Sequence, residues 1–510
     1  MEALDWLVIG VFFLALIGII VWVVRQKQND SADYFLGGRD ATWLAIGASI
    51  FASNIGSEHL IGLAGAGASS GMAMAHWEIQ GWMILILGWV FVPFYSRSMV
   101  YTMPEFLERR YNPQSRTILS VISLVSYVLT KVAVTVYAGG LVFQQVFGIK
   151  ELWGIDFFWI AAIGLVVLTA LYTIFGGMKS VLYTSVLQTP ILLLGSLIIL
   201  VLGFKELGGW DEMMRVCGAV TVNDYGDTMT NLIRSNDDAN FPWLGALIGS
   251  AIIGFWYWCT DQFIVQRVLS GKNEKEARRG TIFGAYLKLL PVFLFLIPGM
   301  IAFALHQKYI GAGGEGFLPM LANGTANADA AFPTLVAKLL PAGVKGLVVC
   351  GILAALMSSL ASLFNSSAML FTIDFYKKYR PKASEKTLLY VGRVATVVVV
   401  VLGILWIPVM KSVGSVLYNY LQDVQSVLAP GIAAAFLLGI CSKKATPKGG
   451  MWGLIAGFII GITRLGAKVY YTSGATFSDS WFKYLFYDTN WLFFCGGMLL
   501  FCMLVIVVVS

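Results

Sequence analysis

The sequence predicts an all-α polytopic membrane protein, from its composition, its long apolar runs and its charge pattern. Of the 510 residues, 58% are hydrophobic and only 12% are charged, and the mean hydropathy is +0.77. A soluble protein carries about 25% charged residues. Runs such as 6–24, 191–202 and 394–407 are apolar over lengths that approach or reach a bilayer span. We therefore expect a lipid bilayer to be the medium of this chain.

Apolar runs separated by short loops predict about thirteen transmembrane helices. Their approximate limits are 5–25, 42–68, 72–96, 117–146, 155–175, 181–205, 241–268, 280–306, 338–373, 388–410, 415–440, 449–469 and 489–509. The first run has no basic region before it, so we interpret it as a retained helix rather than a signal peptide. The chain ends on the apolar run 507–510, which suggests that a further helix of the native protein is missing.

Basic residues cluster in alternate loops. The clusters lie within 25–39, 97–116, 272–279, 377–386 and 443–448. The positive-inside rule places these loops in the cytoplasm, which leaves the N-terminus outside and the C-terminus inside. We expect a multi-pass plasma-membrane protein, and its compact loops favour a bacterial inner membrane. The basic residues are too scattered for a nucleic-acid surface, and no obligate protein partner is evident.

The segment 52–59 places polar side chains inside the second predicted span. Asn54, Glu58 and His59 lie where a membrane helix should be most apolar. One charged side chain at mid-bilayer costs about 2.5–3.5 kcal/mol on insertion scales. We therefore predict a helix broken at 54–57, whose freed backbone groups and polar side chains line a cavity.

Polar residues inside the spans divide the chain into two blocks of five spans. The second and seventh spans, which carry the polar runs 54–59 and 256–262, open these blocks. Because each block has an odd number of spans, the second must lie inverted relative to the first, and two interrupted helices in corresponding positions indicate a transporter site. The predicted organisation is an N-terminal helix and loop (1–41), a first repeat (42–205), an outer loop (206–240), a second repeat (241–440) and two C-terminal helices (441–510).

Oxygen ligands suited to a hard cation occur in two places. Ser358 and Ser359 are adjacent on the ninth span, and the broken second span offers backbone carbonyls around Ala52 and Ile55. Neither set closes a coordination shell alone, but together they can hold a sodium ion. Serine pairs in membrane helices also serve close packing, and spacing alone leaves that alternative open.

A ring of polar side chains from four spans suits a polyhydroxylated ligand. The ring comprises Asn54, His59, Glu78, Lys288 and Gln422. Tyr257 and Trp258 offer an aromatic face on which the apolar side of a sugar ring can stack. The structural alternative is a Glu78–Lys288 ion pair that only holds the bundle together, and for each residue both interpretations stay open.

Three further charged residues have no settled role. Asp261 and Arg267 form either an inner gate or ordinary helix-end anchors, and Lys131 is equally open. No catalytic motif appears, whether His-Glu-x-x-His, a phosphate loop or a nucleophile elbow. We expect a transporter rather than an enzyme. Without a nucleotide site, uphill transport must be driven by an ion gradient.

Four motifs resemble the sodium/solute symporter family, and within it the sodium/glucose cotransporter branch. They are ASIFASNIGSEH (48–59), YTMPEF (101–106), WYWCTDQ (256–262) followed by Gln266 and Arg267, and LMSSLAS (356–362) followed by FNS (364–366). The likeness runs from about residue 33 to residue 453, in the family's order. It implies a LeuT-type fold, with two inverted five-helix repeats and extra flanking helices, and sodium-driven uptake by alternating access.

The resemblance also implies a role for individual residues. It implies sodium ligation by the carbonyls of Ala52, Ile55 and Ala355 and the hydroxyls of Ser358 and Ser359. It implies hexose contacts from Asn54, His59, Glu78, Lys288 and Gln422. Tyr257 would stack beneath the sugar as the inner gate, beside Trp258. Leu63 and Tyr418 match the family's outer hydrophobic lid.

Three positions depart from the family's pattern. Ser185 stands where the family usually has an Asp linked to sodium exit or to a second sodium, and Ala361 stands where two-sodium members carry a Thr. Both changes predict one sodium per cycle. Gly254 replaces a polar residue one turn before Tyr257, so one sugar hydroxyl loses a partner or gains a water.

Together these observations predict a secondary active transporter that imports a neutral hexose, glucose or galactose, with sodium. The nearest alternative is myo-inositol, since residues 56–59 also resemble the inositol members. The alternative of a different class is a sugar-gated sodium sensor or channel that does not transport.

Overall fold

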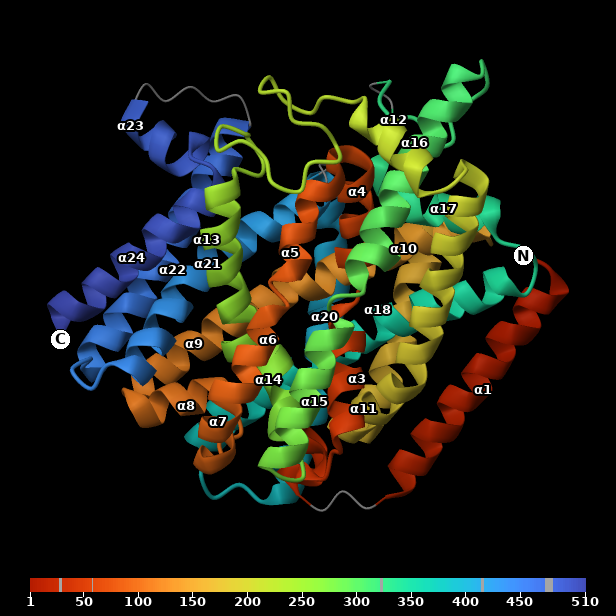
Figure 1. The fold of residues 1–510 in the computed structure, drawn as a ribbon. Coiled ribbons are helices and arrows are strands. Elements are labelled where there is room, and N and C mark those ends of the chain that lie inside the picture. Colours follow the sequence, from red (N-terminus) through yellow and green to blue (C-terminus); the bar gives the residue numbers. More distant parts are fainter. Residues whose placement is uncertain (27–29, 57, 322–323, 414–416, 473–479) are drawn as a thin grey trace.

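The computed structural model describes residues 1–510 except 27–29, 57, 322–323, 414–416 and 473–479, and it is built almost wholly of helices (Figure 1). Ten helical segments of the described chain are long and apolar enough to cross a membrane. They are Ala3–Arg25, Glu58–Ser98, Phe157–Leu207, Trp243–Thr260, Glu274–Gly311, Val344–Tyr379, Glu385–Pro408, Val424–Cys441, Pro447–Lys468 and Trp491–Val509. The all-α polytopic class predicted from the sequence is therefore confirmed.

The elements up to residue 218 include the first predicted block. They are α1 (Ala3–Arg25), α2 (Ser31–Leu36), η1 (Gly37–Arg39), α3 (Trp43–Asn54), η2 (Glu58–Leu63), α4 (Ala64–Ser70), η3 (Gly71–Met74), α5 (Ala75–Ile79), α6 (Trp82–Ile86), η4 (Leu87–Phe91), α7 (Val92–Ser98), α8 (Met103–Arg110), α9 (Pro113–Ser126), η5 (Tyr127–Val132), α10 (Ala133–Phe147), β1 (Glu151–Leu152), β2 (Ile155–Asp156), α11 (Phe157–Leu207) and α12 (Trp210–Gly218). The two short strands pair antiparallel, with Leu152 opposite Ile155.

The elements from residue 243 onward include the second predicted block and the C-terminal helices. They are α13 (Trp243–Gly254), η6 (Phe255–Thr260), α14 (Gln262–Leu269), α15 (Glu274–Leu287), η7 (Val292–Leu296), α16 (Ile297–Gly311), η8 (Ala328–Ala330), α17 (Ala331–Leu339), α18 (Val344–Met369), η9 (Leu370–Tyr376), α19 (Lys377–Tyr379), α20 (Glu385–Val413), α21 (Leu417–Cys441), α22 (Pro447–Thr472), α23 (Ser480–Lys483), η10 (Tyr484–Asp488) and α24 (Trp491–Val509).

The predicted count of thirteen transmembrane helices is not confirmed. One reason is that α11 runs through both the fifth and the sixth predicted spans, with a kink at Gly177, where φ is 56°. A Cβ atom at Gly177 would lie 2.4 Å from the carbonyl oxygen of Tyr34, so this close approach needs a glycine. A second reason is that α3, before the break, is only 12 residues long, too short to span a bilayer alone.

The break predicted at 54–57 is confirmed. Helix α3 ends at Asn54, and the last bond of its ladder runs from the Ile55 amide to the carbonyl of Phe51 (3.0 Å). Ile55 has left the helical region, with ψ of 93°, and the chain resumes at Glu58 as the π-helix η2. The carbonyls of the last turn of α3 therefore point beyond the helix without intrahelical partners.

The corresponding interruption in the second block lies at Asp261. The π-helix η6 ends at Thr260, Asp261 is extended (φ −77°, ψ 128°), and α14 follows. The Asp261 carboxylate accepts a hydrogen bond from the Phe263 amide (3.1 Å) and so caps α14. Both predicted interruptions are thus present, one at the start of each block.

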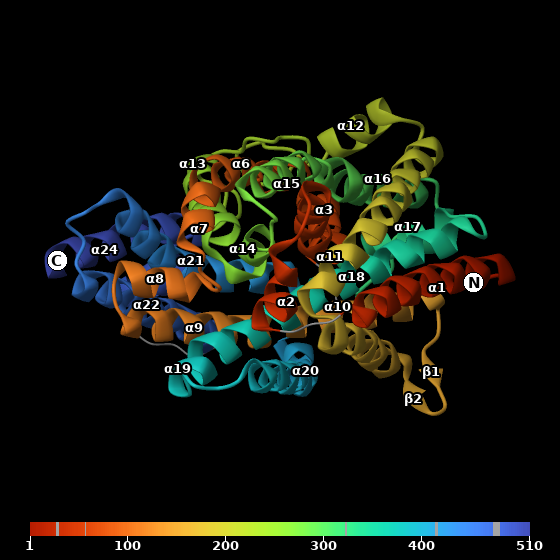
Figure 2. The same cartoon turned by 90° about the horizontal axis from the view of Figure 1, so that it is seen from below.

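Helices α11 and α18 pack together in the interior, and α1 lies along both of them. Helix α3 packs against α15, α11 and α18, so the first break faces elements of both blocks. Seen from below, α21, α22 and α24 form the side of the molecule opposite α1 (Figure 2). The two breaks consequently lie among packed helices rather than at the molecular edge.

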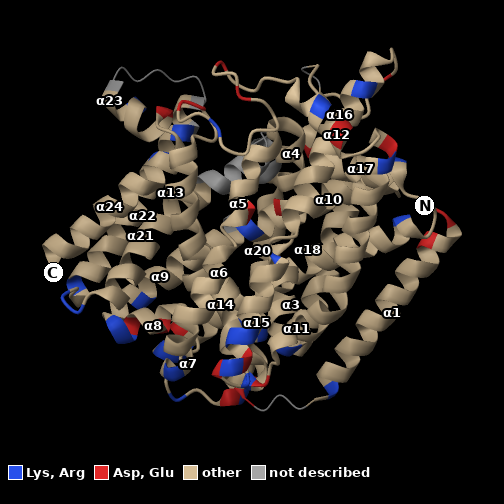
Figure 3. Ribbon diagram, viewed as in Figure 1, with Lys and Arg blue, Asp and Glu red and all other residues tan. Residues whose placement is uncertain are grey.

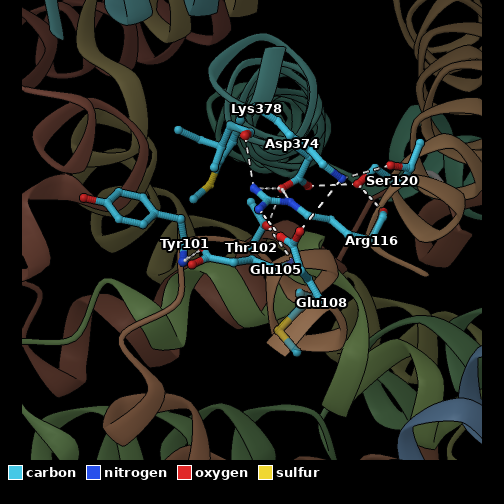
Figure 4. Close-up of polar contacts among 12 residues, drawn as sticks. Tyr101, Thr102, Glu105, Glu108, Arg116, Ser120, Asp374 and Lys378 are labelled. Carbon is cyan, nitrogen blue, oxygen red and sulfur yellow. Dashed lines mark hydrogen bonds and ion pairs between the residues drawn. The ribbon is translucent and has the colours of Figure 1, made fainter. Parts of the chain in front are cut away.

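Charged residues gather at the two ends of the molecule, and the middle is almost free of them (Figure 3). Lys and Arg are concentrated at one end, around α7, α8 and α15. At this end the buried carboxylate of Asp374 joins α8, α9 and η9 (Figure 4). It accepts hydrogen bonds from Thr102 (2.8 Å) and Ser120 (2.9 Å) and pairs with Arg116 (2.7 Å). This network fastens the ends of three helices together.

Candidate functional site

A buried triad of charged and polar side chains lies between the two broken helices. Glu78 on α5 contacts both partners: its Oε2 lies 2.6 Å from Lys288 Nζ, and its Oε1 lies 3.2 Å from His59 Nε2. Lys288 Nζ and His59 Nε2 are 2.7 Å apart. The three side chains are 1–3% exposed. The ion pair that the sequence left open is therefore present, with His59 as a third member.

An aromatic pair adjoins this triad. Tyr257 and Trp258 on η6 pack edge to face with ring centroids 4.9 Å apart, and Lys288 Nζ lies 5.6 Å from the Trp258 ring. The Tyr257 hydroxyl accepts a hydrogen bond from Asn54 Nδ2 (3.0 Å) at the end of α3. A continuous series of contacts thus connects Asn54 to His59 through the two rings and the triad.

Three buried polar atoms around these residues have no hydrogen-bond partner within the described part of the chain. They are Asn54 Oδ1, His59 Nδ1 and Gln80 Oε1. Buried polar atoms are normally paired, so such a group of unpaired atoms is suited to a ligand that brings its own donors and acceptors. Hydroxyl groups both donate and accept, and therefore match all three.

Gln80 is a site residue that sequence reasoning did not single out. Its side chain is buried, and a Cβ atom at Gly254 would lie only 2.5 Å from Gln80 Oε1. The absence of a side chain at Gly254 therefore makes room for Gln80 one turn before Trp258. The sequence analysis expected a sugar hydroxyl to lose a partner at Gly254, and the structure places the amide of Gln80, from the first block, beside that position.

Lys131 and Asp261 form a second buried ion pair beneath the aromatic pair. Lys131 Nζ is 2.7 Å from Asp261 Oδ2 and 4.5 Å from the centre of the Tyr257 ring. Tyr127 donates a hydrogen bond to Asp261 Oδ1. Asp261 is therefore paired with Lys131 and not with Arg267, because its carboxylate turns toward η5 where it begins α14. Lys131, whose role the sequence left open, pairs with Asp261 and lies against the Tyr257 ring.

The serine pair on α18 meets the broken end of α3. Ser359 Oγ donates to the backbone carbonyl of Ser53 (2.8 Å), and Ser358 Oγ lies 3.4 Å from Ser53 Oγ. Gly56 permits this approach, since a Cβ atom there would lie 2.7 Å from Ser359 Oγ. Ala52 and Ala355 are both buried, and Ala355 lies one turn before Ser359 on α18.

These groups share the chemistry of a sodium site. Hydroxyl oxygens from α18 and carbonyl oxygens at the C-terminus of α3 are hard, neutral or partly negative ligands, and the negative end of the α3 dipole adds to their attraction for a cation. Ile55 follows directly at the break and is buried. The structure thus brings Ala52, Ile55, Ala355, Ser358 and Ser359 into one region.

The remaining predicted site residues are placed only in part. Leu63 is buried at the end of η2, next to α4. Tyr418 and Gln422 belong to the first turns of α21, but their side chains lie outside the described residues. Six of the seven predicted substrate contacts are therefore brought together, and Gln422 stays a prediction.

A separate cavity of about 660 Å³ adjoins η2 on the side of α10 and η8. Its lining includes Ile61, Gln144, Asn327 and Asp329. Asp329 sits against Gly65, where a Cβ atom would come within 2.7 Å of its Oδ1, and burial raises the pKa of Asp329 to about 6. Among the described residues, its lining has no aromatic side chain and none of the residues of the triad.

The model of the sodium:solute symporter family matches residues 34–457, which is most of the chain. The chain belongs to the sodium:solute symporter family. This assignment agrees with the resemblance seen in the four sequence motifs. Members of this family are multi-pass membrane transporters, and the chain is therefore one of them.

Two curated members of the symporter family illustrate how similar the chain is to characterised proteins. It is 38% identical to the sodium/glucose cotransporter 1 of Ovis aries, covering 100% of this chain and 78% of that one. It is also 38% identical to the human sodium/myo-inositol cotransporter 2, covering 91% and 70% respectively.

Solved structures support the symporter fold. The chain superposes on a Na⁺-coupled sialic acid symporter with a TM-score of 0.78 at 22% identity, covering 99% of this chain and 97% of that one. It also resembles a nucleobase-cation-symport-1 family transporter, with a TM-score of 0.51 at 13% identity. These likenesses confirm the LeuT-type fold that the symporter motifs implied.

Proposed function

We propose that the chain is a secondary active transporter that imports a neutral hexose, glucose or galactose, together with sodium by alternating access. The observation that carries the proposal is the dual use of the α3 break. Asn54 faces the polar and aromatic site through its side chain, and the preceding residue, Ser53, faces the serine pair through its carbonyl. Two consecutive residues thus serve two sites.

This arrangement supports coupling between ion and sugar. A sodium ion held by the carbonyls of Ala52 and Ile55 would fix the conformation of the break, and the break in turn fixes the Asn54 side chain. Binding of one ligand then favours the other by the same free energy in both directions. Ala355, Ser358 and Ser359 would complete the ion's ligands from α18.

The substrate class follows from the side chains that would meet it. Glu78, Lys288, His59 and Gln80 offer a charged acceptor, a charged donor and two groups that pair with hydroxyls. Tyr257 and Trp258 offer apolar ring faces, and Gln422, Leu63 and Tyr418 would complete the site and its outer lid. A neutral polyhydroxylated ring satisfies both kinds of surface, whereas an anionic substrate would bring a second negative charge beside Glu78.

We infer a stoichiometry of one sodium per sugar. Ser185 has a hydroxyl but no carboxylate, and Ala361 has no side-chain oxygen, so the two positions offer a second ion a weaker set of ligands than an Asp and a Thr would. One sodium ion driven by ~100 mV gains about 2.3 kcal/mol, and a tenfold gradient adds roughly 1.4 kcal/mol. Together these terms are sufficient to concentrate a neutral solute on the order of several hundredfold.

We infer from the basic end of the molecule (Figure 3) that α7, α8 and α15 face the cytoplasm. The N-terminus would then lie outside, in a plasma membrane, and a bacterial inner membrane fits the compact loops. The two repeats would be 42–205 and 241–440, flanked by the segments 1–41, 206–240 and 441–510. Labelling of single cysteines placed in these loops, from each side of sealed vesicles, tests the orientation.

Myo-inositol is the second candidate substrate. The chain is as similar to the human sodium/myo-inositol cotransporter 2 as to the ovine sodium/glucose cotransporter 1, at 38% identity to each. A cyclic polyol presents the same hydroxyl groups as a hexose, so both fit the described side chains. Competition of unlabelled myo-inositol, glucose and galactose against labelled glucose uptake separates them by their relative affinities.

Uptake of labelled sugar into proteoliposomes, with sodium or potassium outside, tests the proposed function. We expect accumulation above the external concentration only with an inward sodium gradient. Accumulation that is indifferent to external sodium would refute symport. A sodium current evoked by sugar without sugar uptake would favour a sensor or channel.

A further inference from the structure

Arg267 is a buried cation that forms no ion pair with any carboxylate of the described residues. Its side chain lies on α14 and is 1% exposed. Within the described ranges, no carboxylate lies at ion-pair distance from its guanidinium, whereas Lys131 and Lys288 each have one. A buried charge that is not neutralised is costly, so the groups that Arg267 contacts are of interest.

Serine hydroxyls take the place of a carboxylate around this guanidinium. Arg267 Nε lies 3.1 Å from Ser49 Oγ and 3.2 Å from Ser53 Oγ, and its Nη2 donates to Ser53 Oγ at 2.7 Å. The Nη1 group donates to the backbone carbonyl of Phe263 on the same helix. Every one of these acceptors is neutral, so the positive charge of Arg267 is solvated but not cancelled.

The same serines contact the proposed sodium ligands. Ser53 Oγ is 3.4 Å from Ser358 Oγ, and the Ser53 carbonyl accepts from Ser359 Oγ at 2.8 Å. Ser185 on α11 gives a second connection, since its Oγ lies 3.2 Å from Ser358 Oγ and 3.4 Å from Ser49 Oγ. Arg267 is therefore connected to Ser358 by two routes. One passes through Ser53 alone, and the other passes through Ser49 and Ser185.

We propose that Arg267 is a fixed positive charge that sets the affinity of the sodium site, and that position 185 is where this charge can be neutralised. The proposal rests on the sodium site of the proposed function. A guanidinium one serine away from Ser358 repels a cation bound there, because charges in a protein interior are screened far less than in water. The ion is then held weakly enough to be released where sodium is scarce.

Position 185 lies where a side chain can change the repulsion between Arg267 and a bound sodium ion. Ser185 touches both Ser49, which solvates the guanidinium, and Ser358, which would bind the ion. A carboxylate at this position would lie between the two cations and attract both. Sodium affinity should therefore rise as the summed charge of residues 185 and 267 falls. That charge is +1 in the unmodified chain, zero in Ser185→Asp or Arg267→Gln, and −1 in the double variant.

Equilibrium binding of radioactive sodium to the purified full chain, without sugar, tests the proposal. Ser185→Asp and Ser185→Asn differ by one charge and little in shape, and we expect the Asp variant to bind sodium at least about tenfold more tightly than the Asn variant. Arg267→Gln should bind more tightly than the unmodified chain, also by about tenfold. The double variant Ser185→Asp with Arg267→Gln should bind most tightly of all.

The measured sodium affinities distinguish an electrostatic role of Arg267 from a structural one. Equal sodium affinity in the Asp and Asn variants would overturn the proposal, as would an absence of sodium binding in every variant. If Arg267 only held the helices together, Arg267→Gln would weaken sodium binding rather than strengthen it. If Arg267→Gln does not fold, the pair of variants at position 185 still tests the charge dependence, because equal sodium affinity in the two would overturn the proposal. Sugar uptake indifferent to sodium would refute the proposed function, whereas charge-dependent sodium binding would be unaffected by that result.

Discussion

Ser359 donates a hydrogen bond from its hydroxyl to the backbone carbonyl of Ser53, at 2.8 Å, and so fastens α18 to the last turn of α3. This contact joins the ninth predicted span to the second through two residues that are 306 positions apart in sequence. Next to it, Asn54 reaches the Tyr257 hydroxyl at 3.0 Å. The end of α3 is therefore the place where the two proposed ligands meet.

The first prediction concerns this serine. Ser359→Ala removes one proposed sodium ligand, and we expect the sodium concentration for half-maximal uptake to rise by about tenfold, the loss of about 1.4 kcal/mol of binding free energy. Ser362→Ala is the matched control, because Ser362 lies one turn along α18 and bonds to Ser53 Oγ (2.7 Å) and the Ser358 carbonyl (2.6 Å) without being a proposed ligand. A rise of the same size in both variants would show that the effect is one of packing.

The second prediction concerns the triad. Glu78→Ala leaves the ammonium of Lys288 buried without its carboxylate, which costs about 3–5 kcal/mol of folding free energy. A loss of sugar binding in that variant alone would therefore be ambiguous. The double variant Glu78→Leu with Lys288→Met replaces the pair by apolar groups, so we expect thermal stability near that of the unmodified chain and sugar binding weakened more than a hundredfold, measured by binding of labelled sugar.

Retained sugar affinity in a stable double variant would show that the pair is structural. If the double variant is as unstable as Glu78→Ala, the main loss of folding free energy comes from the surroundings of His59. His59 loses its carboxylate partner at 3.2 Å in both variants.

The third prediction uses a graded series at Tyr257. Tyr257→Phe keeps the ring above Lys131 but removes the acceptor for Asn54, and a single hydrogen bond contributes about 0.5–1.5 kcal/mol. We expect sugar affinity to fall about two- to tenfold in the Phe variant. Tyr257→Ala also removes the stacking surface, and affinity should fall much further. Equal affinities in the Phe and Ala variants would show that no sugar ring lies on Tyr257.

The sequence was sufficient to locate the polar site, for a physical reason. Asn54, His59, Glu78 and Lys288 lie within apolar spans, and a buried polar group in a membrane must find a partner. The breaks at Asn54 and Asp261 were predictable for the same reason, since a helix interrupted in the bilayer needs polar groups around it.

The pairing of these groups was not predictable from the sequence. Asp261 binds Lys131, 130 positions away, rather than Arg267 only six positions away, because Asp261 caps α14 and Arg267 faces α3 instead. Gln80 approaches Gly254 only because two blocks fold together. The number of spans also depended on tertiary contacts, as the kink at Gly177 arises where the chain passes Tyr34.

The fourth prediction concerns pH. Burial raises the pKa of Asp329 to about 6, above the ordinary value of 3.8. Folding therefore favours the protonated form: the contribution of Asp329 to stability is complete below pH 3.8 and is lost as pH rises through 6. Compared with Asp329→Asn, the unmodified chain should lose at most about 3 kcal/mol between pH 4 and pH 8. Melting temperatures of both chains in detergent across this range check the sign, and a widening advantage of the unmodified chain at high pH would contradict it.

The central claim is that one sodium ion and one sugar bind on either side of the α3 break and move together. Its most direct test is the initial rate of labelled glucose uptake into proteoliposomes as a function of external sodium. We predict uptake that requires sodium, with a Hill coefficient near one, and a glucose affinity that rises with sodium concentration by the same factor by which glucose raises sodium affinity. Glucose uptake of equal rate and affinity in sodium and in potassium would contradict the claim.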